Sequence, residues 1–349
     1  MRSLTLPTLL ALSVVVVAGC GQPDDPQAER AEARMKARRQ REEAAKKPPA
    51  KSRFGPTRSE LLAELKAKNP GFAGEFQMQP SADGSGRVAE VHDLAVKDIS
   101  PLAGLSLVQL DISQCPVEDL GPLKGQKLTG LSLEGTAVED IGPLKDMPLT
   151  VLYLKNTKVK DLEPLKGMQL ALLFLEDTAI EDIGPLKDMP LEKLYLNNTK
   201  VKDIGPLKGS PVQELYLVGT QVSDLKPLVG SQLSGLWLND CPVSDIGPLA
   251  DVPLVTLTLA GTKVADLGPL KGTKIERLHI ADTPVTDLSP LEGLQLKRLI
   301  FTPARITKGI EAVRNMKTLT ELDVQFDPPN HRTLSPADFW PLYDEGKFK

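Results

Sequence analysis

The chain has 349 residues, of which 41% are hydrophobic, 4% aromatic and 25% charged, and its formal net charge at pH 7 is −4. This hydrophobic content is enough to bury a large core, so a chain that is disordered throughout is excluded, and leucine and valine must fill most of that core. The small net charge gives no indication of nucleic-acid binding.

Residues 1–20 are typical of an export signal peptide. Arg2 supplies a positive start, and residues 4–17 form an apolar run that is too short to remain as a membrane-spanning helix. The run ends in "VAGC", which resembles the lipobox of bacterial lipoproteins. This resemblance implies cleavage before Cys20 and attachment of two or three acyl chains to it. An ordinary secretory signal with a chance cysteine is the alternative interpretation.

Acylation would place the mature protein on a membrane, because two or more acyl chains anchor stably where one does not. Gly21 follows Cys20 where an Asp would retain a lipoprotein at the inner membrane. The resemblance therefore implies a lipid-anchored protein of the cell envelope, at the outer membrane or cell surface in preference to the inner membrane.

Residues 21–56 form a charged tether. Residues 27–53 carry ten Lys or Arg against four acidic residues, and this stretch has no apolar stripe with which to pack. A solvated spacer is the simplest interpretation. The alternative is a basic face that lies against anionic lipid or a cell-wall polymer.

Residues 57–106 are predicted to be an N-terminal cap and a first coil. Thr57 and Glu60 have capping-box spacing at the start of "RSELLAELKAK", and Asn69-Pro-Gly ends that helix. Residues 72–79 and 87–96, on either side of "SADGSG", predict a hairpin that leads into the first coil.

Residues 107–306 repeat with a period of 21. The element Asp-(Ile/Leu)-x-Pro-Leu recurs without a slip, and an approximate Leu-x-x-Leu-x-Leu-x-x-Thr-x-Val precedes it from the second copy onward. The recurrence begins at Asp98, Asp119, Asp140, Asp161, Asp182, Asp203, Asp224, Asp245, Asp266 and Asp287. One coil cannot bury its own leucines, whereas stacked coils can, so this period predicts a solenoid.

The pattern resembles leucine-rich repeats, with Thr or Cys where Asn is more common. "T-x-V-x-D-I-x-P-L" is similar to internalin-type repeats, and "PLKGMQL" and "PLKDMPL" resemble bacterial 21-residue "PLKGMPL" arrays. The resemblance implies a right-handed α/β-type superhelix with a parallel sheet on its concave face, short 3-10 or loop segments on its convex side, and helical caps. Some such arrays are joined to kinases, but the glycine-rich loop, "HRD" and "DFG" are missing here.

Two charged columns follow from the period. The repeated aspartates are predicted to accept turn amide hydrogens, because one carboxylate per coil falls short of the six to eight oxygens that calcium requires; a calcium ladder is the alternative. A lysine column is predicted to be a solvated convex face, with an anion-binding surface as its alternative. Its members are Lys124, Lys145, Lys166, Lys187 and Lys208.

Cys115 and Cys241 both occupy the Thr position of the repeat, six coils apart. At about 4.8 Å per coil they are separated by nearly 30 Å, so no disulfide is expected and both are predicted to be buried.

One strand position is predicted to face the concave side in every coil. Reading that column gives Asp111, Ser132, Tyr153, Phe174, Tyr195, Tyr216, Trp237, Thr258, His279 and Ile300. Five successive aromatics with polar neighbours indicate an interaction site. The predicted ligand-binding residues are Tyr153, Phe174, Tyr195, Tyr216, Trp237 and His279. The alternative is that the rings stabilise adjacent coils and bind nothing.

Residues 307–349 are predicted to form a final coil of 23 residues and a C-terminal cap, in which "SPADFWPLYDEGKFK" starts as a capped helix. No catalytic, metal-binding or cofactor-binding constellation is expected, because His92 and His279 lie about 40 Å apart by the coil spacing. The predicted function is non-enzymatic recognition of a protein or peptide partner, with a glycan as a variant. A passive spacer of the cell envelope is the alternative.

Overall fold

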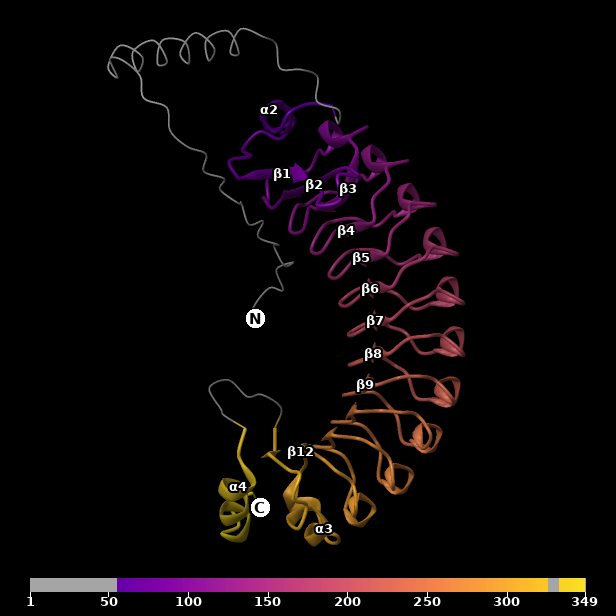
Figure 1. Ribbon diagram of the computed structural model, residues 1–349, viewed down its shortest axis with the longest axis vertical. Helices are drawn as coiled ribbons and strands as arrows, with labels where there is room; N and C mark the ends of the chain where they lie inside the picture. The colour runs from indigo at the N-terminus through magenta and orange to yellow at the C-terminus, as the bar shows by residue number, and fades with distance from the viewer. Residues whose placement is uncertain (1–54, 326–332, 349) are drawn as a thin grey trace, which may run out of the picture. The chain divides into compact units, whose positions relative to one another are not determined.

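The computed structural model describes residues 55–325 and 333–348. Residues 53–349 form one compact unit, which is a leucine-rich-repeat solenoid. In this unit the strands lie on the inner side of a curve and the 3-10 turns on its outer side (Figure 1). The predicted signal peptide, Cys20 and most of the tether lie outside the described residues, and none of the helices described is long and apolar enough to cross a membrane.

A single 13-stranded sheet runs through the described residues in chain order. Its first two strands form the predicted hairpin, which is antiparallel, and every later pair is parallel. The strands are β1 (Phe76–Pro80), β2 (Arg87–Val91), β3 (Leu107–Asp111), β4 (Gly130–Ser132), β5 (Val151–Tyr153), β6 (Leu172–Phe174), β7 (Lys193–Tyr195), β8 (Glu214–Tyr216), β9 (Gly235–Trp237), β10 (Thr256–Thr258), β11 (Arg277–His279), β12 (Arg298–Ile300) and β13 (Glu321–Asp323).

The register of the sheet equals the sequence period. Leu152 pairs with Leu173 and Leu173 with Leu194, each 21 residues further on, whereas Leu299 pairs with Leu322 across the final 23-residue coil. Because side chains alternate along a strand, the same alternate positions point into the core in every coil. From β3 to β12 the residues at these positions are mostly leucines, as predicted, with Ile112, Ile280 and Phe301 in three coils, and all are at most 2% exposed.

A one-turn 3-10 helix follows each aspartate of the column on the outer side. In all ten coils the aspartate Oδ1 accepts a hydrogen bond from the backbone N–H two residues later, over 2.7–2.9 Å. These turns are η1 (Ser100–Leu102), η2 (Gly121–Leu123), η3 (Gly142–Leu144), η4 (Glu163–Leu165), η5 (Gly184–Leu186), η6 (Gly205–Leu207), η7 (Lys226–Leu228), η8 (Gly247–Leu249), η9 (Gly268–Leu270) and η10 (Ser289–Leu291). The predicted amide-accepting role of the aspartates is therefore confirmed.

Hydrogen bonds made by the buried threonines explain why this repeat has Thr at the position where other leucine-rich repeats more often have Asn. Thr157 Oγ1 donates to the carbonyl oxygen of Leu154 over 2.7 Å, and Thr178 and Thr199 make the equivalent bond. The hydroxyl thus satisfies a carbonyl that the short strand leaves unpaired. Cys115 and Cys241 replace Thr in two coils, and their predicted burial is confirmed. Their Sγ atoms lie 3.3 and 3.0 Å from the carbonyl oxygens of Val91 and Leu217.

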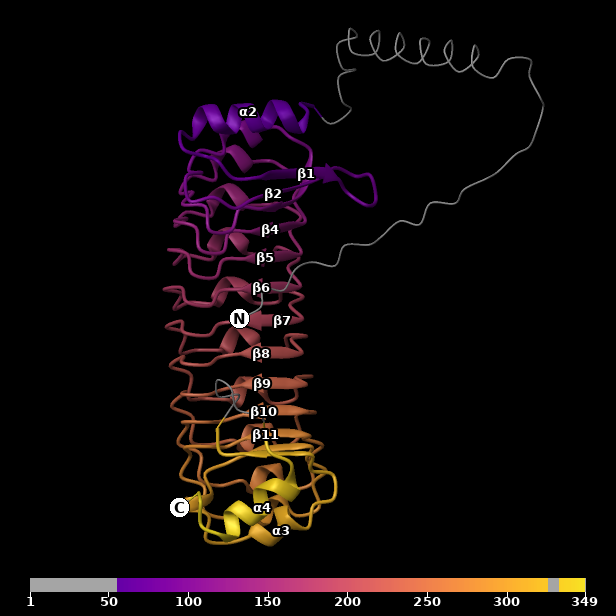
Figure 2. The same cartoon turned by 90° about the vertical axis from the view of Figure 1, so that its left-hand side faces the viewer.

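Helices lie at both ends of the stack (Figure 2). At the N-terminal end is α2 (Arg58–Lys68), which starts with the predicted Thr57–Glu60 capping box and buries Leu61 and Leu65. At the C-terminal end are η11 (Pro303–Arg305), α3 (Ile310–Arg314) and α4 (Pro336–Asp344). Phe339 of α4 is fully buried, and its ring lies 5.7 Å from that of Phe301.

Candidate binding surface

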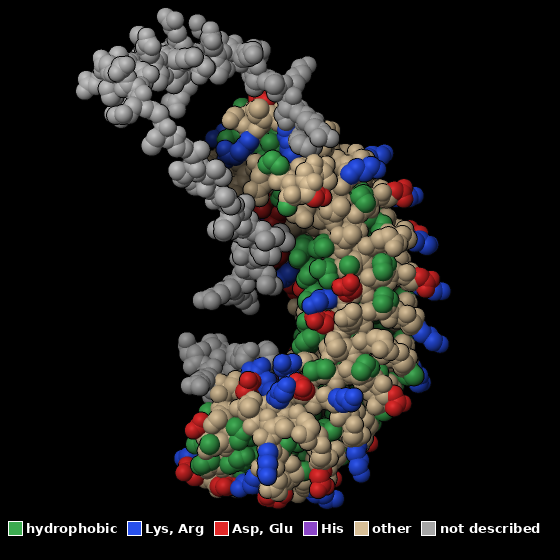
Figure 3. Space-filling view, in the orientation of Figure 1, with side chains coloured by type: hydrophobic (Ala, Val, Ile, Leu, Met, Phe, Trp, Pro, Cys, Tyr) green, Lys and Arg blue, Asp and Glu red, His purple; other side chains and the backbone are tan. Residues whose placement is uncertain are grey.

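Five aromatic rings form a continuous stack across β5–β9, and we call this set the ring stripe. The ring centroids are separated by 4.2, 4.3, 4.1 and 3.9 Å, with interplanar angles of 7–15°. All five side chains are half-buried, and hydrophobic groups gather on the inner side of the middle coils (Figure 3). The stripe consists of Tyr153, Phe174, Tyr195, Tyr216 and Trp237.

Curvature determines which part of each ring is accessible. Strands in a sheet lie about 4.8 Å apart, and the rings are closer together than this because they project inside the curve. At this separation, neighbouring rings cover the faces of Phe174, Tyr195 and Tyr216 on both sides. The stripe therefore presents ring edges to the inner side, and only Tyr153 and Trp237 have a face that no other stripe ring covers.

A polar cluster lies beside the middle of the stripe. Glu214 accepts hydrogen bonds from Lys193 Nζ over 2.9 Å and from the Tyr216 hydroxyl over 3.0 Å. Burial, the hydroxyl of Tyr195 and the charge of Glu214 together raise the pKa of Tyr216 far above its usual range. The Tyr216 phenol stays protonated and serves as a neutral hydrogen-bonding group.

Gly235 makes room for the largest ring. A Cβ at this position would lie 2.6 Å from Cη2 and Cζ3 of Trp237, so the indole occupies the space that a side chain would fill. The glycine allows Trp237 to lie flat against Tyr216 at 3.9 Å.

The rim two residues after each ring combines charged and amide groups. Lys155 Nζ lies 3.9 Å from Glu134 Oε1, and Asn197 Oδ1 accepts from the N–H of Val218 over 3.0 Å. Burial raises the pKa of Glu176, whose Oε2 atom is buried without a hydrogen-bond partner. The rim thus offers both donors and acceptors next to an apolar ridge.

The C-terminal end of the column differs from the sequence prediction. His279 pairs in register with Thr258 and Ile300, as expected, but all three are buried, and His279 is only 6% exposed. The prediction that the column faces solvent throughout, with His279 in the binding site, is therefore wrong at this end. Burial lowers the pKa of His279 to about 4, with Arg298 contributing in the same direction.

The chain returns to the sheet at this end, which the repeat pattern did not predict. Leu334 forms an antiparallel bridge with Leu322, and Arg298 donates to Thr333 Oγ1 over 3.1 Å. The residues that follow the last coil have no period of their own, so no sequence signal identified their position.

The charged columns on the outer side are engaged in local contacts. The aspartates are occupied by the turn amides, and no group of three or more His, Cys, Asp or Glu suited to a metal occurs among the described residues. Each residue of the lysine column is exposed, and Lys166 Nζ pairs with Glu163 Oε1 over 2.9 Å.

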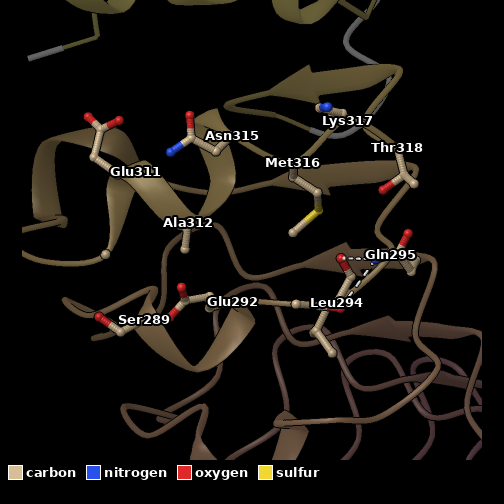
Figure 4. Close-up of a pocket in the computed structure, with 12 residues that line it drawn as sticks. Ser289, Glu292, Leu294, Gln295, Glu311, Ala312, Asn315, Met316, Lys317 and Thr318 are labelled. Carbon is tan, nitrogen blue, oxygen red and sulfur yellow. Dashed lines mark hydrogen bonds between the residues drawn. The ribbon is translucent and has the colours of Figure 1, made fainter.

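A cavity of about 580 Å³ lies away from the ring stripe, between η10 and α3 (Figure 4). It opens where the 23-residue coil replaces a 3-10 turn with a helix. The cavity is lined by the carboxylates of Glu292 and Glu311 and by the amides of Gln295 and Asn315. Gln295 Nε2 donates hydrogen bonds to the carbonyl oxygens of Gly293 and Leu294.

Comparison with known proteins identifies the fold. No protein-family model and no curated protein sequence matches the chain. Among solved structures it is similar to an internalin (inlF) from Listeria monocytogenes, with 25% identity and a TM-score of 0.60, over 67% of this chain and 74% of the other. It is also similar to the leucine-rich repeat domain of APL1B, with 16% identity and a TM-score of 0.50, over 66% and 78% of the two chains. The chain is a leucine-rich-repeat solenoid whose structural neighbours include internalins.

Proposed function

We propose that this protein is a non-enzymatic, lipid-anchored recognition scaffold that binds a protein or peptide partner through the ring stripe. The observation that supports this proposal most directly is a row of five aromatic side chains in register on the inner side of the solenoid. These side chains are half-exposed and bordered by polar groups. Aromatic ridges surrounded by polar groups are typical of protein interaction sites.

The stacking geometry favours a protein partner over a glycan. Sugar rings bind aromatics through the ring face, and the faces of the three middle rings are covered by their neighbours. Ring edges carry partial positive charge, so they suit carbonyl oxygens and the faces of a partner's aromatic side chains. Tyr195 and Tyr216 add hydroxyl groups for hydrogen bonds.

The same stack supports the alternative of a passive envelope spacer, in which the rings only stabilise adjacent coils. Each stacked pair contributes about 0.5–1.5 kcal/mol beyond its buried area. Alanine variants of the rings would lose packing as well as binding, so they do not separate the two functions. A variant that leaves the stack intact is needed.

Val218→Arg meets this need, because Val218 is a half-exposed rim residue next to the stripe that forms no part of the stack. Cross-linking in envelope extract is expected to recover a partner with the wild type and to lose it with Val218→Arg. The matched control is Val229→Arg, since Val229 is 63% exposed next to η7 on the outer side. Equal recovery with all three proteins would exclude the stripe as the binding site, and no partner with any of them would support the spacer.

The lipid anchor is tested separately. We propose that Cys20 carries the acyl chains and holds the solenoid in the cell envelope, at the outer membrane or cell surface. Metabolic labelling with an alkyne fatty acid is expected to mark the wild type and not Cys20→Ser, and the variant is expected to leave the membrane fraction. Labelling that persists in Cys20→Ser would contradict the anchor.

A further inference from the structure

The two ends of the ring stripe differ in how exposed the next residue of the column is. The residue that follows Trp237 in the column, Thr258, is only 5% exposed, so that end is closed. At the other end Tyr153 pairs in register with Ser132, and Val151 pairs with Gly130. Both of these small residues are half-exposed. Among the described residues Tyr153 has one ring contact, with Phe174, and its other side faces the coil that carries Ser132 and Gly130. The side chain of Gln109 lies across Gly130, and Ser132 Oγ is 2.7 Å from Ser113 Oγ. We call this place the notch.

Carboxylates surround this notch. Asp111 precedes Ser132 in the column, and Glu134 lies two residues after Ser132. Their side chains are 33% and 38% exposed, and the nearest basic groups are His92 Nε2, 3.8 Å from Asp111, and Lys155 Nζ, 3.9 Å from Glu134. Asp111 Oδ1 also accepts hydrogen bonds from the N–H and Oγ of Ser113.

The same carboxylates affect the pKa of Tyr153. Burial raises this pKa, and the charges of Asp111, Glu134 and Glu176 raise it further. The notch therefore combines one free aromatic face with a negative potential, which is the environment that a cation prefers.

We propose that this notch receives an arginine side chain of the partner, an inference that rests on the ring stripe being a binding surface. The guanidinium plane continues the stack as a sixth layer on Tyr153, and its N–H groups donate to Asp111 and Glu134. Arginine fits better than lysine because its planar group stacks on a ring while donating in its own plane to carboxylates. Gly130 and Ser132 are small, and the exposed side chain of Gln109, which lies across Gly130, must move aside to admit this layer.

The experiment selects ligands for the whole protein from a display library of random 12-residue peptides. Wild-type protein is expected to enrich peptides that combine apolar residues with arginine. Replacing that arginine with neutral, isosteric citrulline in a synthetic consensus peptide is expected to weaken binding about tenfold, as loss of a stacked and paired cation should.

Protein variants then locate the contact. The double variant Asp111→Asn, Glu134→Gln is expected to bind the arginine and citrulline peptides alike, and Ser132→Tyr, which fills the notch with a ring, is expected to do the same. Glu118→Gln is the matched control, because it removes an exposed charge on the segment that leads away from β3 to η2 and should keep the tenfold preference.

The outcomes separate this inference from the proposed function. Enrichment without arginine, or an arginine preference that survives in the double variant, overturns the notch while leaving the stripe as a binding surface. Absence of enrichment, or peptides that bind Val218→Arg as well as they bind wild type, overturns the proposed function itself. Melting curves of every variant establish that a loss of binding is not a loss of folding.

Discussion

Position within the stack determines how much each ring contributes to stability. Tyr195 contacts a ring on both faces, at 4.3 and 4.1 Å, whereas Tyr153 contacts a single ring within the described part of the chain. These contacts add to the interface between coils that the buried leucines and the short strands form.

Tyr195→Ala is expected to lower the free energy of unfolding by about 1–3 kcal/mol through lost stacking, and Tyr153→Ala by about half as much. Urea unfolding followed by circular dichroism measures both. Tyr195→Phe keeps the ring and serves as the control, with a much smaller loss expected. Similar losses for the two alanine variants would show that stacking is not the source of the effect.

His279 makes stability depend on pH. Its folded pKa of about 4 lies below the value of about 6.5 for the unfolded chain, so the unfolded state takes up the proton first. The contribution is fully present above pH 6.5 and is lost as pH falls toward 4, by at most about 3 kcal/mol. The free energy of unfolding of His279→Gln, measured from pH 7 to pH 4.5, should fall less steeply than that of wild type. Parallel curves would contradict this.

At the scale of elements, the aspartate caps hold each 3-10 turn in place. Asp203→Ala is expected to cost about 0.5–2 kcal/mol, because the N–H of Gly205 loses its acceptor at 2.7 Å. Asp203→Asn keeps an acceptor oxygen and should cost much less. Added calcium should leave the melting temperature of wild type unchanged. A rise in melting temperature would instead support calcium binding along the aspartate column.

The periodic elements and the locally signalled N-terminal helix and hairpin were predictable, whereas the position of the non-repeating C-terminal segment against the sheet was not. The strand register, the 3-10 turns and the ring column follow from a period of 21, because each coil repeats the environment of the one before it. Leu94 stands 21 residues before the buried Cys115, yet it is 78% exposed, although Val88, Ala89 and Glu90 pair with residues 21 positions later. The burial of His279 likewise accompanies a non-repeating C-terminal segment. The sequence left open whether the rings stack on one another or bind a ligand, since residue type alone does not reveal ring orientation.

At the scale of the whole molecule, the solenoid is expected to tolerate the loss of complete coils. Deleting residues 138–179 removes 42 residues, or two periods, and joins Ala137 to Ile180, whose sequence continues almost as before. The shortened protein should fold and melt several degrees lower, since two coil interfaces are lost. Deleting residues 138–177 instead breaks the period and should abolish cooperative melting. Equal behaviour of the two deletions would contradict a strict 21-residue geometry.

The close spacing of the ring stripe has a mechanical consequence. Rings whose centroids are about 4 Å apart are already at van der Waals contact, so the arc cannot tighten without compressing them. Straightening only separates rings that attract one another weakly. The stack therefore acts as a one-way bending stop, stiff against closure and compliant toward opening, and a bulky partner is accommodated by widening of the arc rather than by wrapping around it.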